Sequence, residues 1–477
     1  MMERGQILAL DQGTHATRAV VFDDRGRVIA TAQQRVDLYR RSHAEVEQDA
    51  RLILASMRSV IAEVLVSPGV QPSRIDAAGL ATQRSSVVAW NREDGEALSP
   101  LLSWQDRRNE SLVASLMEHH SVIQNKTGLC LSAHYGASKL RWLLEQEPAV
   151  ARARASGRLL MGPLAAWLMY HLIAGNPAWV DHANASRTLL WNLHSRDWDA
   201  QLLAMFGVPG SALPACRPIC SDYGVIAGCG IPLRAVNGDQ TAALYAQGRP
   251  EPGSLFVNLG TGAFVLLPVA DVTAPPSGLL AGVSQSREGT ADYYLEGTVN
   301  GAGAALDWAA NRLAIANPER RLAAWLAQID EPPLFINTVG GLGAPWWQAG
   351  PAPVFLGEPA SPAHALVSVV ESILFLIQVN IESLQAHAPD SRRVRLSGGL
   401  ARLDGVCQKL ADLSGLTVLR QPMTEATARG IAWQAAGCPA EWPPSGREDI
   451  FQPQSNSALH RRYRQFVEAL KRQLREQ

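Results

Sequence analysis

The feature that most constrains the fold is a strand–turn–strand unit that occurs once in each half of the 477-residue chain. The first unit is ILALDQGTHATRAVVFDD, residues 7–24, and the second is SLFVNLGTGAFVLLPV, residues 254–269. In each, two apolar runs flank a turn of small and hydroxyl residues, a pattern typical of paired strands. A chain of this length exceeds what one hydrophobic core usually serves. We therefore expect two domains built on one plan.

Helical and strand patterns alternate after each unit, which predicts the α/β class. Residues 49–66 place apolar side chains at helical spacing, and IDAAGLATQ, residues 75–83, resumes a buried strand. The densest apolar run, residues 366–379, is interrupted by Glu371 and Gln378 and suits a buried core helix better than a membrane span. The last segment, residues 460–477, carries an apolar face typical of a docking helix, and its basic outer face is typical of solvent exposure.

Composition excludes several functional classes. Hydrophobic residues make up 47% and charged residues 18%, as in a folded globular protein. The formal net charge of -1 gives no general attraction to nucleic acid, so a small molecule is the expected partner, with neither nucleic acid nor membrane. The start MMERGQ leads into an apolar run too short for a secretory signal core, so we expect a cytoplasmic protein. The six cysteines do not form a disulfide or zinc pattern and are expected to be reduced thiols.

Carboxylates and glycines follow three of the predicted strands. Asp11 stands in the first turn, Asp239 stands between a strand and a helix, and Gly260 and Gly262 form the second turn. Strand ends that face an interdomain cleft are the usual ligand sites of α/β proteins. Backbone N–H groups of such turns bind phosphate, and carboxylates there can hold Mg²⁺ or accept a proton in phosphoryl transfer. Each residue also has a plainer interpretation, as a turn residue, a helix cap or a tight-turn glycine.

Other nucleotide motifs are absent or incomplete. The sequence contains no G-x-x-x-x-G-K-[ST], and GAGAAL at Gly301 has Leu306 in the third glycine position of a dinucleotide fingerprint. A P-loop or Rossmann enzyme is therefore not predicted.

Ten stretches, in order, carry a family resemblance. They are LDQGT, TQRSS, WQDRR, NASRTLLWNLHSRDWD, NGDQTAAL, LGTGAF, LEGTV, GLGAPWW, LSGGLARLDG and TEATARGIA. On these motifs the chain resembles the FGGY family of carbohydrate kinases, and within it the glycerol kinases, over nearly its full length. The resemblance implies two actin-like, ribonuclease-H-like domains around a central cleft that binds ATP, Mg²⁺ and a small polyol or sugar.

The resemblance also assigns roles to residues. It places Asp11 and Asp239 at the metal and makes Asp239 the base that takes the proton from the acceptor hydroxyl. Residues implied to contact the nucleotide are Gly13, Thr14, Arg18, Thr261, Gly262, Gly398 and Gly399. Residues implied to contact the acceptor are Arg84, Ser85, Trp104, His134, Tyr135, Asp239 and Gln240. Family members are frequently dimers or tetramers, so the resemblance allows a homodimer or homotetramer.

Four positions depart from the glycerol kinase pattern. Ser85 stands where a glutamate grips the substrate hydroxyls, and His134 aligns with a substrate-contacting tyrosine unless a one-residue shift restores Tyr135. Ala165 replaces an aspartate, and Leu403 replaces an asparagine that commonly meets the adenine. The smaller Ser85 leads to the hypothesis of an acceptor larger than glycerol, such as a four- or five-carbon polyol or ketose, as for xylulokinases and ribulokinases.

The predicted domains are residues 1–242 on the acceptor side, 243–450 on the nucleotide side, and a C-terminal helical segment, 451–477, that packs on the body. The leading interpretation is an ATP-dependent kinase for a terminal hydroxyl of a small polyol or sugar. An ATPase or phosphohydrolase on the same plan would lack the acceptor residues Arg84, Trp104 and Gln240. A non-catalytic ATP- or sugar-binding regulatory protein is the third interpretation, favoured by the pocket changes alone.

Overall fold

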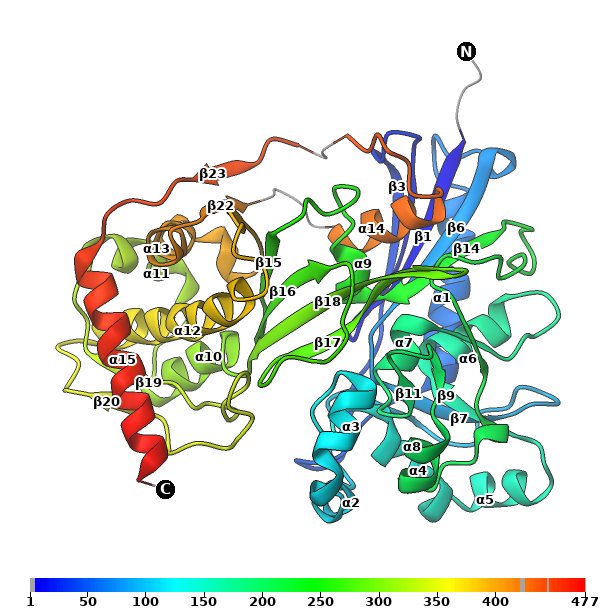
Figure 1. Ribbon diagram of the computed structural model, residues 1–477. Coiled ribbons are helices and arrows are strands. Elements are labelled where there is room, and N and C mark those ends of the chain that lie inside the picture. Colours follow the sequence, from blue (N-terminus) through cyan, green and yellow to red (C-terminus); the bar gives the residue numbers. More distant parts are fainter. Residues whose placement is uncertain (1–4, 421–424, 444–445, 477) are drawn as a thin grey trace.

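The computed structural model describes residues 5–420, 425–443 and 446–476. Its first large sheet has the strand order β14-β6-β1-β2-β3 (Figure 1). Strands β1, β2 and β3 form an antiparallel meander, and β6 and β14 run parallel to β1. The bounds are β1 Gln6–Gln12, β2 Ala16–Phe22, β3 Val28–Arg35, β6 Ile75–Thr82 and β14 Leu233–Gly238.

The second large sheet repeats this plan with additional strands at its edges. Its order is β17-β18-β16-β15-β21-β22-β23, in which β15, β16 and β18 are antiparallel neighbours and β21 and β22 continue the sheet parallel to β15. The bounds are β15 Ser254–Leu259, β16 Ala263–Val269, β17 Leu280–Arg287, β18 Thr290–Val299, β21 Arg393–Gly398, β22 Thr417–Arg420 and β23 Asp449–Phe451. The prediction of two domains on one plan is therefore confirmed.

Further elements of the N-terminal half extend its core. A five-stranded sheet of order β4-β5-β8-β7-β9 and several helices follow β3. The bounds are β4 Tyr39–Arg40, β5 Val46–Gln48, α1 Ala50–Leu65, β7 Val87–Asn91, β8 Leu101–Leu102, α2 Glu110–Ser115, α3 His120–Thr127, α4 Gly136–Gln146, α5 Pro148–Ala155, β9 Leu159–Pro163, α6 Leu164–Leu172, β10 Trp179–Asp181, α7 His182–Ser186, β11 Trp191–Asn192, β12 Asp197–Trp198, α8 Ala200–Phe206, β13 Ala215–Arg217 and α9 Asp239–Ala243.

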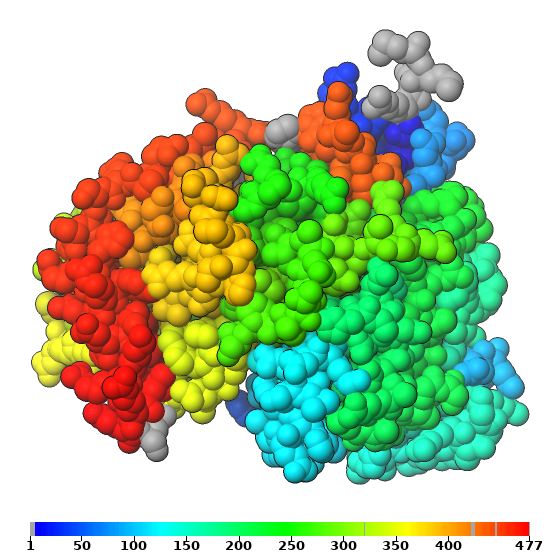
Figure 2. Space-filling model, viewed as in Figure 1, coloured from blue at the N-terminus to red at the C-terminus, as the bar shows by residue number. Residues whose placement is uncertain are grey.

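The C-terminal half is built around α12, Pro362–Gln385. By length and composition α12 could cross a membrane, but 89% of its most apolar window is buried inside the protein, as expected for a core helix. The C-terminal helix α15, Ser457–Arg475, packs on it through ring contacts of Phe375 with Tyr463 and Phe466, and covers one side of this half (Figure 2). The remaining elements are α10 Gly303–Arg312, α11 Glu319–Gln328, β19 Leu334–Ile336, β20 Val354–Leu356, α13 Asp404–Ser414 and α14 Ala426–Ala435.

Helix α14 joins the two halves, because it lies against the N-terminal sheet although it follows β22 in the chain (Figure 1). Two glycines permit this contact. A Cβ on Gly79 of β6 would lie 2.7 Å from the Ile431 carbonyl oxygen, and one on Gly430 would lie 1.8 Å from the Ala242 carbonyl oxygen. Arg429 holds the helix in place, because its Nε donates a hydrogen bond to the Ala246 carbonyl at 2.7 Å. The domain bounds given above stay a prediction.

Candidate active site

The candidate site begins at the carboxyl ends of three neighbouring parallel strands. The register pairs Asp11 of β1 with Ala81 of β6, and Gly238 of β14 with Thr82 of β6. Asp11, the segment that follows Thr82, and Asp239 therefore leave the sheet at the same edge, where α/β sheets bind ligands.

Asp11 lies in a crowded acidic environment. Its side chain is buried, and the Arg18 Nη1 lies 3.5 Å from its Oδ2. Burial, together with the nearby carboxylates of Asp239 and Glu425, raises the pKa of Asp11 to about 7 against the opposing charge of Arg18. Among the described residues, the buried Oε2 of Glu425 has no hydrogen-bond partner.

This donor set fits Mg²⁺. Carboxylate oxygens are its preferred protein ligands, and it usually takes one or two of them with phosphate and water oxygens completing the shell. Within the described residues there is no group of three or more histidine, cysteine, aspartate or glutamate side chains that could hold a metal without such help. The crowded carboxylates therefore suit a metal that arrives with a phosphate ligand.

Asp239 is the first residue of α9 and is half-buried. The Gln240 backbone N–H donates to its Oδ1 at 2.7 Å, and the Arg84 Nε lies 3.9 Å from the same oxygen. Burial raises the pKa of Asp239, and the Arg84 charge opposes that rise. Gly238 makes the approach of Arg84 possible, since a Cβ there would lie 2.4 Å from the Arg84 Cδ.

Arg84 connects the two halves. Its guanidinium donates to the Gln240 side-chain oxygen and, at 3.0 Å, to the hydroxyl of Tyr294 in β18. Tyr294 also accepts from Arg187, which forms a buried ion pair with Glu296. No role was predicted from the sequence for Tyr294, Arg187 or Glu296. Arg187 lies within NASRTLLW and Glu296 within LEGTV, which offered signals, whereas only the pairing of β18 places Tyr294 here.

Ser85 occupies a buried, left-handed position with φ 63°. Its carbonyl accepts from the Lys139 Nζ at 3.0 Å, and the same ammonium donates to the His134 carbonyl at 2.6 Å. Lys139 thereby ties the Ser85 turn to the loop before α4. The Ser85 Oγ has no hydrogen-bond partner within the part of the chain that the structure describes. A buried hydroxyl without a partner is costly, which suggests a ligand at this point.

Trp104, His134 and Tyr135 form an aromatic wall beside this turn. The Trp104 and His134 ring centroids lie 5.6 Å apart, and those of His134 and Tyr135 lie 5.0 Å apart. Burial lowers the pKa of His134 well below its usual value, so its imidazole is neutral. The Trp104 indole donates to the Thr14 Oγ1 at 3.0 Å, which places that hydroxyl beside the predicted acceptor residues.

The predicted nucleotide glycines of the second half lie together. Leu259 pairs with Gly398 where the parallel strands β15 and β21 end, so the Gly260–Gly262 turn adjoins Gly398 and Gly399. Gly398 has φ 98°, and a Cβ there would lie 2.4 Å from the Leu259 carbonyl oxygen.

The turns themselves are held by backbone hydrogen bonds. The Thr261 carbonyl accepts the Ala302 and Ala304 N–H groups at 3.1 and 3.0 Å, at the start of α10. In the first turn, the Gly13 N–H donates to Ala16 O at 2.9 Å. Of the two remaining departures from the family pattern, Ala165 is buried within α6, and Leu403 occupies the position before α13 without a capping side-chain hydrogen bond.

A cavity of about 80 Å³ lies where α9 meets the second sheet. Its lining includes Gln240, Phe256, Phe264, Ser397 and Ala426, so it borders both halves. Of the predicted site residues, Gln240 lines this cavity, and the placement of the others around an interdomain cleft stays a prediction.

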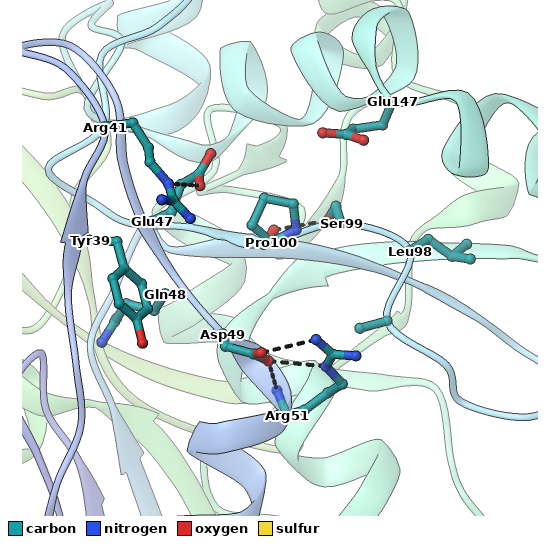
Figure 3. A pocket seen from close by; sticks show the side chains of 11 residues that line it. Tyr39, Arg41, Glu47, Gln48, Asp49, Arg51, Leu98, Ser99, Pro100 and Glu147 are labelled. Atoms are coloured by element: carbon teal, nitrogen blue, oxygen red, sulfur yellow. Dashed lines mark hydrogen bonds and ion pairs between the residues drawn. The ribbon is translucent and has the colours of Figure 1, made fainter.

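A larger cavity of about 590 Å³ lies away from the strand ends (Figure 3). Its two arginines are already paired, Arg41 with Glu47 at 3.3 Å and Arg51 with Asp49 at 3.0 Å. It therefore offers no net positive charge for a phosphate. Gln48, in its wall, donates to the Thr14 carbonyl at 3.0 Å and supports the first turn from behind.

Two α/β domains on one plan, with carboxylates at the strand ends of one and glycine turns at the strand ends of the other, fit the class of enzymes that transfer phosphoryl groups. Residues 6–244 match the N-terminal domain of the FGGY family of carbohydrate kinases, and residues 255–437 match the C-terminal domain. The chain belongs to the FGGY family of carbohydrate kinases, enzymes that phosphorylate an alcohol group.

Relatives and solved structures agree with this family. The glycerol kinase of Halorhodospira halophila is 32% identical over 493 residues, with 99% of this chain and 97% of that protein covered. The glycerol kinase of Polaromonas naphthalenivorans is 34% identical, with 90% of each covered. The structure of Plasmodium falciparum glycerol kinase with ADP superposes with a TM-score of 0.89 at 23% identity, and that of xylulose kinase from Rhodospirillum rubrum with 0.85 at 22%, each covering 98% of both chains.

Proposed function

We propose that this protein transfers the γ-phosphoryl group of ATP to a terminal hydroxyl of a small polyol, as expected for a glycerol kinase. The observation that carries the proposal is the placement of Asp239. Its carboxylate is oriented by the Gln240 N–H, lies beside Arg84, and shares one sheet edge with Asp11. The relatives named glycerol kinase support the choice of a polyol acceptor.

In the proposed reaction, the acceptor oxygen attacks the γ-phosphorus while its proton passes to the Asp239 carboxylate. The bond between the γ-phosphorus and the bridging oxygen breaks, and ADP leaves with that electron pair. The charge of Arg84 favours the ionised form of Asp239, and Arg84 orients the acceptor hydroxyl. Asp11 and Asp239 would hold Mg²⁺, which would neutralise phosphate charge.

The acceptor pocket distinguishes two substrate candidates. Trp104 offers an apolar face to a carbon skeleton, and the Ser85 hydroxyl is short, buried and without a partner among the described residues. With serine in place of glutamate, the pocket has room for a longer chain. A four- or five-carbon polyol or ketose is therefore the second candidate, with glycerol the first.

The test is ADP release by the purified protein with MgATP and glycerol, erythritol, threitol, ribitol, xylitol, xylulose or ribulose, against a blank without acceptor. Highest kcat/KM for glycerol supports the first candidate, and preference for a longer acceptor supports the second. If no acceptor stimulates ADP release, the kinase proposal fails in favour of a non-catalytic binding protein.

Location and assembly remain predictions. A cytoplasmic location fits a reaction that consumes ATP. A homodimer or homotetramer fits the assemblies that are frequent in the family. Sedimentation of the purified chain would give the assembly directly.

A further inference from the structure

Two thiols from distant parts of the chain meet on the side of the N-terminal sheet that α14 covers. Cys220 lies in the segment before β14, and Cys438 lies just after α14. Both are half-buried and pack against the same hydrophobic cluster, which includes Tyr245 and Trp433. Neither belongs to the candidate active site.

The end of strand β17 holds both cysteines. The Cys220 N–H donates to the Ser286 carbonyl at 2.9 Å, and the Gln285 Nε2 donates to the Cys438 Sγ at 3.2 Å. The exposed Arg287 donates to the Gly437 carbonyl at 3.0 Å and also contacts the Cys438 sulfur. Three consecutive residues thus fix the two thiols relative to each other.

The backbone of Cys438 is constrained as well. Its N–H donates to the Trp433 carbonyl at 3.0 Å and closes the end of α14, and it has φ 60°. A left-handed cysteine is uncommon and is kept only where the surrounding structure determines it. The constraint presents the sulfur toward Gln285, Arg287 and Cys220.

The two sulfurs differ in protonation. A hydrogen bond from the Cys220 thiol, then those from Arg287 and Gln285, lower the pKa of Cys438 to about 7 although burial opposes this. The same pairing raises the pKa of Cys220 well above its ordinary value. Reactive cysteines occur in such partly exposed settings beside a cation, and a neighbouring thiol can resolve their oxidised form.

We propose that Cys438 and Cys220 form a peroxide-reactive dithiol site, with Cys438 as the nucleophile and Cys220 as the resolving thiol. The Cys438 thiolate attacks one oxygen of hydrogen peroxide, the O–O bond breaks, and hydroxide leaves and takes up a proton to become water. Cys438 is then a sulfenic acid. The Cys220 sulfur attacks it, the S–O bond breaks, and the second water leaves with the Cys220 proton. One peroxide is reduced, and the two thiols are oxidised to one disulfide.

The disulfide would tie α14 to the segment before β14. At its other end α14 touches the candidate active site, where the Thr427 Oγ1 donates to the Asp239 carbonyl at 3.2 Å. The cross-link therefore restrains a helix that contacts the proposed base, although the dithiol site itself does not depend on the proposed kinase activity.

The test is peptide mapping of the full-length protein after treatment with an equimolar amount of hydrogen peroxide. We expect a Cys220–Cys438 cross-linked peptide, reversed by dithiothreitol, while Cys130, Cys216, Cys229 and Cys407 stay reduced. Oxidation of any of these four ahead of Cys438, or no cross-link between the pair, would overturn the proposal.

Variants separate the two roles. In Cys220→Ser, a dimedone adduct should accumulate on Cys438, whereas in Cys438→Ser the Cys220 thiol should stay unreactive. Arg287→Met should slow oxidation of Cys438 by roughly threefold or more, because a smaller thiolate fraction outweighs a more nucleophilic sulfur. Cys216→Ser is the matched control and should leave the rate unchanged. An unchanged rate in Arg287→Met, with unfolding temperatures equal to wild type, would contradict the assignment of the nucleophile.

Discussion

Replacing Gly430 with alanine tests how α14 is seated between the two halves. Gly430 lies inside this helix, where propensity alone predicts that alanine stabilises the protein by about 1 kcal/mol. The tertiary contact predicts the opposite sign. A Cβ at this position would lie 1.8 Å from the Ala242 carbonyl oxygen and 2.7 Å from its carbon.

The size of the change in the free energy of unfolding depends on which atoms can move to relieve this contact. Both partners are backbone, so α14 and α9 must separate by more than an ångström before the contact becomes acceptable. Overpacking of a well-packed core costs about 1–3 kcal/mol, and the upper part of that range applies where no flexible side chain can yield. After the gain in propensity is subtracted, we expect Gly430→Ala to lower the free energy of unfolding by about 1–2 kcal/mol.

The assay is equilibrium unfolding in urea, followed by circular dichroism and tryptophan fluorescence, because a two-domain chain need not unfold in one step. Gly399→Ala is the matched control. Gly399 has helical angles, φ -60° and ψ -45°, and a Cβ there would meet nothing within 4 Å. This variant should gain about 0.4–1 kcal/mol through the unfolded state.

The two glycines should therefore respond with opposite signs. If Gly430→Ala is as stable as wild type or more so, while Gly399→Ala gains stability, the close contact of α14 with Ala242 is refuted. Hydrogen exchange adds a local measure, since amides of α14 should lose protection first in Gly430→Ala.

Four further predictions concern the candidate site. Asp239→Asn should lower kcat by about 10²–10⁴-fold without unfolding the protein, measured as acceptor-dependent ADP release, and an unchanged kcat would exclude Asp239 as the base. Ser85→Glu should raise the ratio of kcat/KM for glycerol to kcat/KM for erythritol. The expected change is equivalent to one hydrogen bond to a charged group, about 1.5–3 kcal/mol. If this ratio does not change, Ser85 does not set the specificity. Glu296→Gln strips the buried Arg187 of its counter-charge and should cost about 3–5 kcal/mol in urea unfolding, partly recovered when Arg187→Met is added; a cost below 1 kcal/mol would contradict the pairing. Burial lowers the pKa of Lys139 from 10.5 to about 7, so between these two pH values the unfolded chain binds one more proton than the folded chain. The free energy of unfolding, measured relative to Lys139→Met, should therefore rise with pH by at most about 1.4 kcal/mol per pH unit. A difference between the two proteins that stays constant across this window would refute the pKa shift.

Local pattern predicted much of this architecture. The apolar alternation around Asp11 and around Gly260–Gly262 specified two hairpins, and both form, as β1–β2 and β15–β16. The interrupted apolar run at residues 366–379 lies within the buried helix α12. Such features are readable because the periodicity of a strand or helix lies within a few neighbouring residues.

The acceptor pocket was only partly readable. Arg84, Trp104 and Glu296 stand in recognisable motifs, but Tyr294 does not. Tyr294 and Glu296 reach the site because β18 pairs with β16 in a register that aims alternate side chains at the N-terminal half. No local pattern encodes which strand from the other half will complete a pocket.

Sequence by itself determined the two strand–turn–strand units and the residue types at the strand ends, since these depend on local periodicity and turn chemistry. Only the tertiary structure decided that α14 returns to the N-terminal sheet, that Arg84 bridges Gln240 and Tyr294, and that Cys220 meets Cys438. Those outcomes depend on close contacts between segments far apart in the chain, where one missing Cβ, as at Gly79 or Gly430, decides whether two backbones can meet.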